Sequence, residues 1–168
     1  ANASQVSSQT ASSGQAGTLS SGSSTYLFDE NGFDCAEMIE KSVMGAVFMN
    51  QALNVYFGPD KMNVDNATAV NASASEYYTT MEHHWDEAFG YFGVPTDFPT
   101  TAATQFWGKY CNSQDSTLGC NELMMSNFLK GRAAISNKVY ADRDQSINTI
   151  RTTWENISAN QAISYMDK

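Results

Sequence analysis

The sequence predicts an all-α protein, a bundle of about four main helices joined by long loops. Apolar residues recur at helical spacing in several long stretches, and the alternation typical of strands is almost absent. The clearest pattern is Ile147, Ile150, Trp154 and Ile157, whose spacing of three and four residues is typical of the apolar seam of a bundle helix. With 168 residues, 42% of them hydrophobic, the chain is long enough for one substantial core.

The first 25 residues differ in composition from the rest of the chain. Ser, Thr, Gly, Ala and Gln dominate this segment, and it contains no charged residue. Such a composition is typical of a flexible linker or a long surface segment rather than of a packed element. We therefore expect a disordered or extended segment over residues 1–25 and a single helical domain over residues 26–168.

Start and stop signals divide the helical part. Asp34 is a typical residue to begin a helix, and Gly58 followed by Pro59 ends it. A second helix ends at Gly93, before Pro95. The expected helices cover residues 34–57, 76–92, 102–110 (a short one), 121–135 and 140–166, with loops at 60–75 and 111–120.

The charge balance excludes several classes of partner. Eighteen acidic residues outweigh nine basic ones, so the net charge is −9. No basic stripe is present to neutralise phosphates, which excludes a nucleic-acid-binding protein and disfavours an anionic membrane surface. No apolar run approaches the roughly 18 residues that a transmembrane helix needs. An acidic surface favours cations as ligands.

The densest chemistry lies between residues 82 and 87, which include both histidines of the chain and three carboxylates. On a helix, His84 and Glu87 lie one turn apart, at the border between the apolar face and solvent. An imidazole and a carboxylate so placed can chelate a divalent transition metal such as iron or zinc. The alternative is a plain hydrogen bond between the two side chains. Less favoured further ligands are His83, Asp86 and Glu40.

A second polar cluster follows the first long helix. Asp60, Asn63 and Asp65 offer oxygen atoms of the kind that calcium prefers. The segment lacks the glycine and the terminal glutamate of an EF-hand loop, so it is not one. Turns and a helix cap are the alternative explanation for the same residues.

Two of the three cysteines flank a short polar segment. Cys111 and Cys120 bracket residues 112–119, and closing so short a loop as a disulfide is geometrically easy. Such a bond is favoured only in an oxidising compartment, and the alternative is two unpaired thiols in the cytosol. Cys35 is left over, and we expect it to be a small buried apolar residue.

Five motifs, in order, resemble a known bacterial family. They are IEKSVMGAVFMNQALNVY, DKMNVDNAT, MEHHWDEAFGYFGVP, FWGKY and GRAAISNKVYADRD. Together they are similar to the family called domain of unknown function 4856, over about residues 26–165. Its members are secreted or lipid-anchored, which implies a location outside the cytoplasm: secreted, periplasmic or at the cell surface. They look longer than this chain at both ends, which implies that it is the central part of a longer protein.

The same family looks like a relative of imelysin-type helical proteins, which are extracytoplasmic and linked to iron uptake. Those proteins carry a G-x-H-x-x-E motif whose His and Glu are proposed metal ligands. His84 and Glu87 match the H-x-x-E part, and Glu82 stands at the position of the glycine. The resemblance implies an imelysin-like bundle in which His84 and Glu87 are the expected metal ligands.

Three functions remain open at this point. The first is an extracytoplasmic binding protein for a transition metal, an iron complex or a small ligand. The second is a structural, adhesive or self-assembling surface module without metal, which packs against copies of itself or other segments of a longer precursor. The third is a metallohydrolase, but a catalytic zinc needs three protein ligands and the spacing offers no third. The metallohydrolase is therefore the least favoured of the three, and the question of enzymatic activity stays open with a leaning against it.

Overall fold

The computed structural model describes residues 6–68 and 70–166. It divides the chain into two compact units, residues 1–47 and residues 48–168. The prediction of a mostly helical protein is confirmed, but the chain also contains a small two-stranded hairpin. None of the helices in the described ranges is long and apolar enough to cross a membrane.

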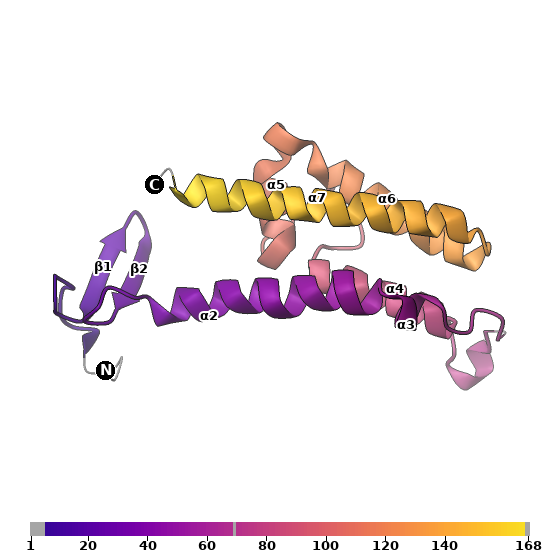
Figure 1. The fold of residues 1–168 in the computed structure, drawn as a ribbon, viewed down its shortest axis with the longest axis horizontal. Helices are drawn as coiled ribbons and strands as arrows, with labels where there is room; N and C mark the ends of the chain where they lie inside the picture. The colour runs from indigo at the N-terminus through magenta and orange to yellow at the C-terminus, as the bar shows by residue number, and fades with distance from the viewer. Residues whose placement is uncertain (1–5, 69, 167–168) are drawn as a thin grey trace. The chain divides into compact units, whose positions relative to one another are not determined.

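The hairpin lies in the N-terminal unit and is drawn in indigo and violet in Figure 1. Strands β1 (Gly17–Ser21) and β2 (Ser24–Phe28) are antiparallel. Gly22 begins the two-residue turn with φ +59°, a conformation that glycine adopts without strain. This hairpin corrects the expectation of an all-α protein, because residues 17–28 form paired strands. The strands lack apolar alternation because half of their residues are exposed and only Gly17 among them is buried, so neither face forms a core.

The helix expected over residues 34–57 is present, but its second half is not an ordinary α-helix. Helix α2 (Cys35–Val43) begins where the Asp34 carboxylate accepts hydrogen bonds from two backbone amides. Two π-helices follow, η1 (Met44–Met49) and η2 (Gln51–Tyr56). Their i→i+5 hydrogen bonds are rare in proteins and are frequent at functional sites. Short helix α3 (Pro59–Met62) comes next, with proline at its first position.

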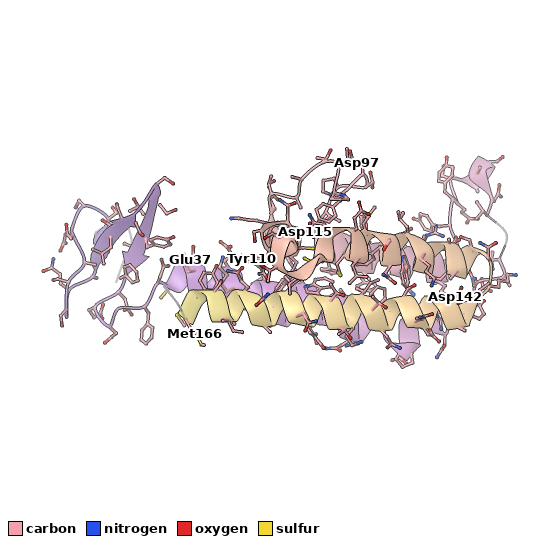
Figure 2. All side chains as sticks on the ribbon, turned by 90° about the horizontal axis from the view of Figure 1, so that it is seen from above. Glu37, Asp97, Tyr110, Asp115, Asp142 and Met166 are labelled. Atoms are coloured by element: carbon pink, nitrogen blue, oxygen red, sulfur yellow. The ribbon has the colours of Figure 1, made fainter. Side chains whose placement is uncertain are left out.

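Helices α6 (Cys120–Ser136) and α7 (Tyr140–Met166) form the main layer of the C-terminal unit. Only three residues join them, so they run antiparallel and side by side (Figure 1). Figure 2 labels Asp142 near the start of α7 and Met166 at its far end. The predicted seam of α7 is confirmed, because Ile150, Trp154 and Ile157 are completely buried.

Helix α5 (Phe106–Leu118) packs against both α6 and α7. It extends through most of the segment that the sequence predicted to be a polar loop. That prediction is wrong because the polar residues form the more exposed side of a helix whose other side buries Cys111. Gly119, with φ +59°, ends α5 and also caps α6. The carboxylate of Asp115, which is labelled in Figure 2, accepts a 2.7 Å hydrogen bond from the backbone amide of Asn121.

Helix α4 (Thr80–Phe92) carries the candidate site residues. It begins four residues later than expected because Thr79 and Glu82 form a reciprocal capping box. Its buried side packs against η2 and α6. A single 3-10 turn, η3 (Ala72–Ala74), lies in the segment that precedes it. The buried residues of α4 are Met81, Glu82, Trp85, Ala88 and Phe92.

Trp85 fixes the distance between α4 and α6. Its indole is 1% exposed, and its Nε1 donates a 3.0 Å hydrogen bond to the Phe128 carbonyl. The ring lies against Gly131, where an added Cβ would come within 2.1 Å of the indole Cη2. The close approach of the two helices therefore requires glycine at this position.

We expect Gly131→Ala to lower the free energy of unfolding by about 1–3 kcal/mol, because the new methyl group overlaps the Trp85 ring. Gly90→Ala is the matched control, since a Cβ at Gly90 would have nothing within 4 Å. Replacing a glycine inside a helix by alanine should stabilise the control by about 0.5–1 kcal/mol. Urea unfolding of both variants measures the difference, and equal effects would contradict this account of the contact.

Candidate functional site

His84 is held in one defined orientation by the backbone. Its Nδ1 lies 3.0 Å from the carbonyl oxygen of Lys61. A carbonyl oxygen can only accept, so Nδ1 carries the proton and the neutral ring keeps its lone pair on Nε2. Metal-binding histidines are commonly oriented in this way, with the other ring nitrogen hydrogen-bonded to a carbonyl or carboxylate.

Glu87 lies one turn along α4, but its carboxylate is directed toward the other histidine. Oε1 of Glu87 is 3.5 Å from Nε2 of His83, and the two side chains are 39% and 46% exposed. The sequence instead suggested His84 as its partner. His84 is turned toward the Lys61 carbonyl, which leaves His83, four residues before Glu87, as the nearer imidazole. The metal-ligand set itself stays a prediction.

Both histidines belong to a continuous line of aromatic rings. His83 stacks on Tyr78 with ring centres 5.1 Å apart, and His84 lies 6.1 Å from both His83 and Tyr56. Tyr56 in turn lies 5.7 Å from Tyr91. Burial, together with the negative charge of Glu87, raises the pKa of Tyr56. We call the whole line the aromatic row: Tyr78, His83, His84, Tyr56, Tyr91, Phe48 and Phe106.

The far end of the aromatic row is hollowed. A groove of about 300 Å³ is lined by three of its rings, by the carboxylate-bearing Glu87 and by Gly90. The rings of Phe48 and Phe106 stand nearly perpendicular, at 81°, with centres 5.1 Å apart. We call this the aromatic groove, and its lining residues are Phe48, Glu87, Gly90, Tyr91 and Phe106.

Sequence reasoning singled out His84 and Glu87 but missed Phe48, Tyr56 and Phe106 as site residues. Phe48 and Tyr56 lie in the two π-helices, whose wider turns carry both rings to Tyr91. Phe106 begins α5 with φ +48°, which is unusual for a bulky residue. No spacing rule for an α-helix would have joined these positions.

Asp86, a less favoured ligand candidate, is held by an arginine. Its carboxylate accepts a 3.0 Å hydrogen bond from Arg132 Nε, and a second nitrogen of Arg132 lies 2.5 Å from the buried Glu82. Burial disfavours the charge of Glu82, yet hydrogen bonds from Ser136, the Thr79 amide and Arg132 outweigh it and lower its pKa. Sequence reasoning missed this cluster, although the pattern Thr79-x-x-Glu82, typical of a capping box, could have revealed its start.

The remaining metal candidates have local partners. Glu40 lies in the N-terminal unit, where its carboxylate is 2.6 Å from Lys41 Nζ. Asp65 accepts 3.1 Å hydrogen bonds from the Ala67 and Thr68 amides, and hydrogen bonding from Thr68 and Ala67 lowers its pKa. The calcium loop of Asp60, Asn63 and Asp65 stays a prediction. Within residues 6–68 and 70–166, no group of three or more His, Cys, Asp or Glu side chains could hold a metal ion.

Cys111 and Cys120 are completely buried where α5 meets α6. Both are free thiols here, and Cys120 Sγ donates a 3.1 Å hydrogen bond to the Cys111 carbonyl. Burial raises the pKa of both thiols. The disulfide between them stays a prediction. Cys35 is exposed rather than buried, because it is the first residue of α2 and lies next to the Asp34 cap.

A comparison with protein families finds one match. The family model described as Domain of unknown function (DUF4856) matches residues 1–168. The chain belongs to this family. The match covers the N-terminal segment as well as the residues that carry the sequence motifs. No curated protein and no solved structure matches the chain.

We expect Cys111 and Cys120 to be joined in protein purified from an oxidising compartment, and Cys35 to be free. The corner at Gly119 brings the first two together, whereas Cys35 lies in the other unit. Because the thiolate is the reactive form and burial disfavours it, the bond should form during folding rather than afterwards. Peptide mapping of unreduced protein would decide, and finding both thiols free would refute the bond.

The lowered pKa of Glu82 predicts a pH dependence of stability. Its contribution is present above the unfolded-state pKa of about 4.5 and is lost as the pH falls through the lower folded-state pKa. Glu82→Gln should therefore be much less stable than wild type at pH 7, and the difference should shrink on acidification below about pH 4.5. Glu155→Gln, at an exposed position of α7, is the control and should change little. A constant difference across this pH range would contradict the assignment.

Proposed function

We propose that this chain is an extracytoplasmic helical binding protein that takes a transition metal, or an iron complex, through Nε2 of His84. The observation that carries the proposal is the hydrogen bond from His84 Nδ1 to the Lys61 carbonyl. It fixes the tautomer and the ring orientation that a metal-bound imidazole needs, so little entropy is lost when the metal binds.

Glu87 is the proposed second ligand. It lies one turn from His84 on α4, and a rotation of its side chain away from His83 would bring a hard, anionic oxygen beside the imidazole. Iron and zinc both accept this pair of donors. The resemblance of the family to imelysin-type proteins, including their bundle and their H-x-x-E motif, supports the same residues and an extracytoplasmic location.

The aromatic row favours a complexed metal over a bare ion. A metal that arrives with an organic ligand needs few donors from the protein, and the organic part needs a surface to pack against. Tyr56 lies directly beside the His84 ring and is partly exposed. Aromatic faces of this kind suit a flat organic ligand.

A self-assembling surface module is the second candidate, and a specific surface favours it. An apolar groove of about 310 Å³ runs between α4 and α6, bordered by Leu129, whose side chain is 59% exposed. Exposed apolar grooves of this type mark surfaces that contact other proteins. In this version the histidines and Glu87 contribute only to helix stability.

We expect His84→Ala and Glu87→Ala each to abolish the binding of iron or zinc, because each removes a ligand. His83→Ala is the matched control on the same helix. It should keep measurable metal binding, since losing a neighbouring group typically costs about 10–100-fold in affinity rather than all of it. Calorimetric titration of each variant with the metal ions, and then with an iron complex, measures the effect.

Melting temperatures distinguish the two candidate functions. With metal bound, a chelator should lower the melting temperature of wild type but not of His84→Ala. In the surface-module version, the substitutions lower the melting temperature equally with and without chelator. Equal metal affinity in wild type, His84→Ala and Glu87→Ala would eliminate the metal site.

A further inference from the structure

The aromatic side chains that line the aromatic groove have no role in the proposed metal site. Three elements build it: η1 contributes Phe48, α4 contributes Glu87, Gly90 and Tyr91, and α5 contributes Phe106. Apart from the carboxylate of Glu87 and the hydroxyl of Tyr91, its side-chain walls are hydrocarbon. A volume of about 300 Å³ is at the lower end of the range for small-molecule sites.

The walls of the aromatic groove are arranged around a free space rather than collapsed on it. Phe106, 43% exposed, keeps its ring at 81° to that of Phe48 although its backbone adopts φ +48°. Backbone conformations of this kind are costly for a bulky residue, and they recur where a side chain must be presented to a ligand. Gly90, another lining residue, is exposed, and an added Cβ there would have nothing within 4 Å.

Charge and aromatic faces in the aromatic groove select the same kind of ligand. The faces of aromatic rings are electron-rich and attract cations. Glu87 adds a full negative charge, and no Lys or Arg is among the residues that line the groove. The influence of Glu87 extends along the row, because its charge contributes to the raised pKa of Tyr56. The net charge of −9 adds a long-range attraction for cations.

From this combination we infer that the aromatic groove binds a small, free alkylammonium ion of the choline class. A quaternary ammonium group carries a diffuse charge and has no N–H to satisfy, so aromatic faces and one carboxylate are sufficient to hold it. A phospholipid headgroup would bring an anionic phosphate next to Glu87, which favours the free ion over a membrane surface. This site lies beyond the proposed metal function and shares only Glu87 with it.

The test compares choline with its uncharged carbon isostere, 3,3-dimethyl-1-butanol, by calorimetric titration in the presence of a chelator. The two have the same shape, so a difference reports the charge alone. We expect choline to bind saturably and at least about tenfold more tightly than the isostere, with an affinity that falls as salt is added. Equal binding of both, or no saturable binding of choline, would overturn the inference.

Substitution at Gly90 separates the groove from the rest of the chain. Gly90→Leu should fill the groove and abolish choline binding, while the helix tolerates leucine better than glycine. The control is Thr152→Leu, at an exposed position of α7, which should leave choline affinity unchanged. Circular dichroism checks that both variants remain helical. Choline binding that survives Gly90→Leu would place the ligand elsewhere and refute the site.

Two further variants test the wall and the charge without filling the groove. Phe106→Leu keeps an apolar wall but removes the ring face, and Glu87→Gln keeps the shape but removes the charge. Each should weaken choline binding by about tenfold and bring it close to that of the isostere. His84→Ala should leave choline affinity unchanged, so that failure of the metal site and failure of this site give different results. Binding to phosphatidylcholine vesicles without binding to choline would contradict the free-ion assignment.

Discussion

The seating of the Trp85 indole on Gly131 is the contact on which the C-terminal unit depends. Helices α6 and α7 form a pair by themselves, and α4 must be fixed against that pair before its outer face can have any defined geometry. The indole fills the space left by the missing side chain and donates a hydrogen bond to the Phe128 carbonyl. These two contacts together fix the rotation of α4 about its own axis and its position along α6. His84, Glu87 and Tyr91 lie at the edge of the buried face of the same helix, so the same contacts also fix their positions.

A polar contact on the same helix complements this apolar one. The Glu82 carboxylate accepts a hydrogen bond from the Thr79 backbone amide at the start of α4, and at the same time it binds Arg132 and Ser136 of α6. Because it is buried, its charge is tolerated only while all of these partners are in place. The ion pair thus fixes the first turn of α4, and Trp85 fixes the next one.

The sequence was informative wherever one α-helix buries one face. The seam of α7 and the existence of α4 and α6 follow from spacing, and the structure agrees. The sequence was misleading where we assigned a segment from its composition rather than from the spacing of its apolar residues. The polar residues after Cys111 suggested a loop, but they cover the outer side of a helix. The Ser-rich segment hid a hairpin because its pairing is made by the backbone, which leaves no pattern in the side chains. The candidate site was predicted only in its α4 half, since the π-helical residues Phe48 and Tyr56 follow no α-helical spacing.

The corner at Gly119 has a consequence for how the molecule is degraded. A protease must draw several residues of extended chain into its cleft, and such stretches usually come from exposed loops. Only Gly119, in the left-handed conformation, separates α5 from α6, so this corner contains no extended loop that a protease could bind. Cleavage between the two helices therefore requires that their adjoining ends unwind first. Where proteases are present, such a corner extends the lifetime of the fold in a way that thermodynamic stability alone does not express.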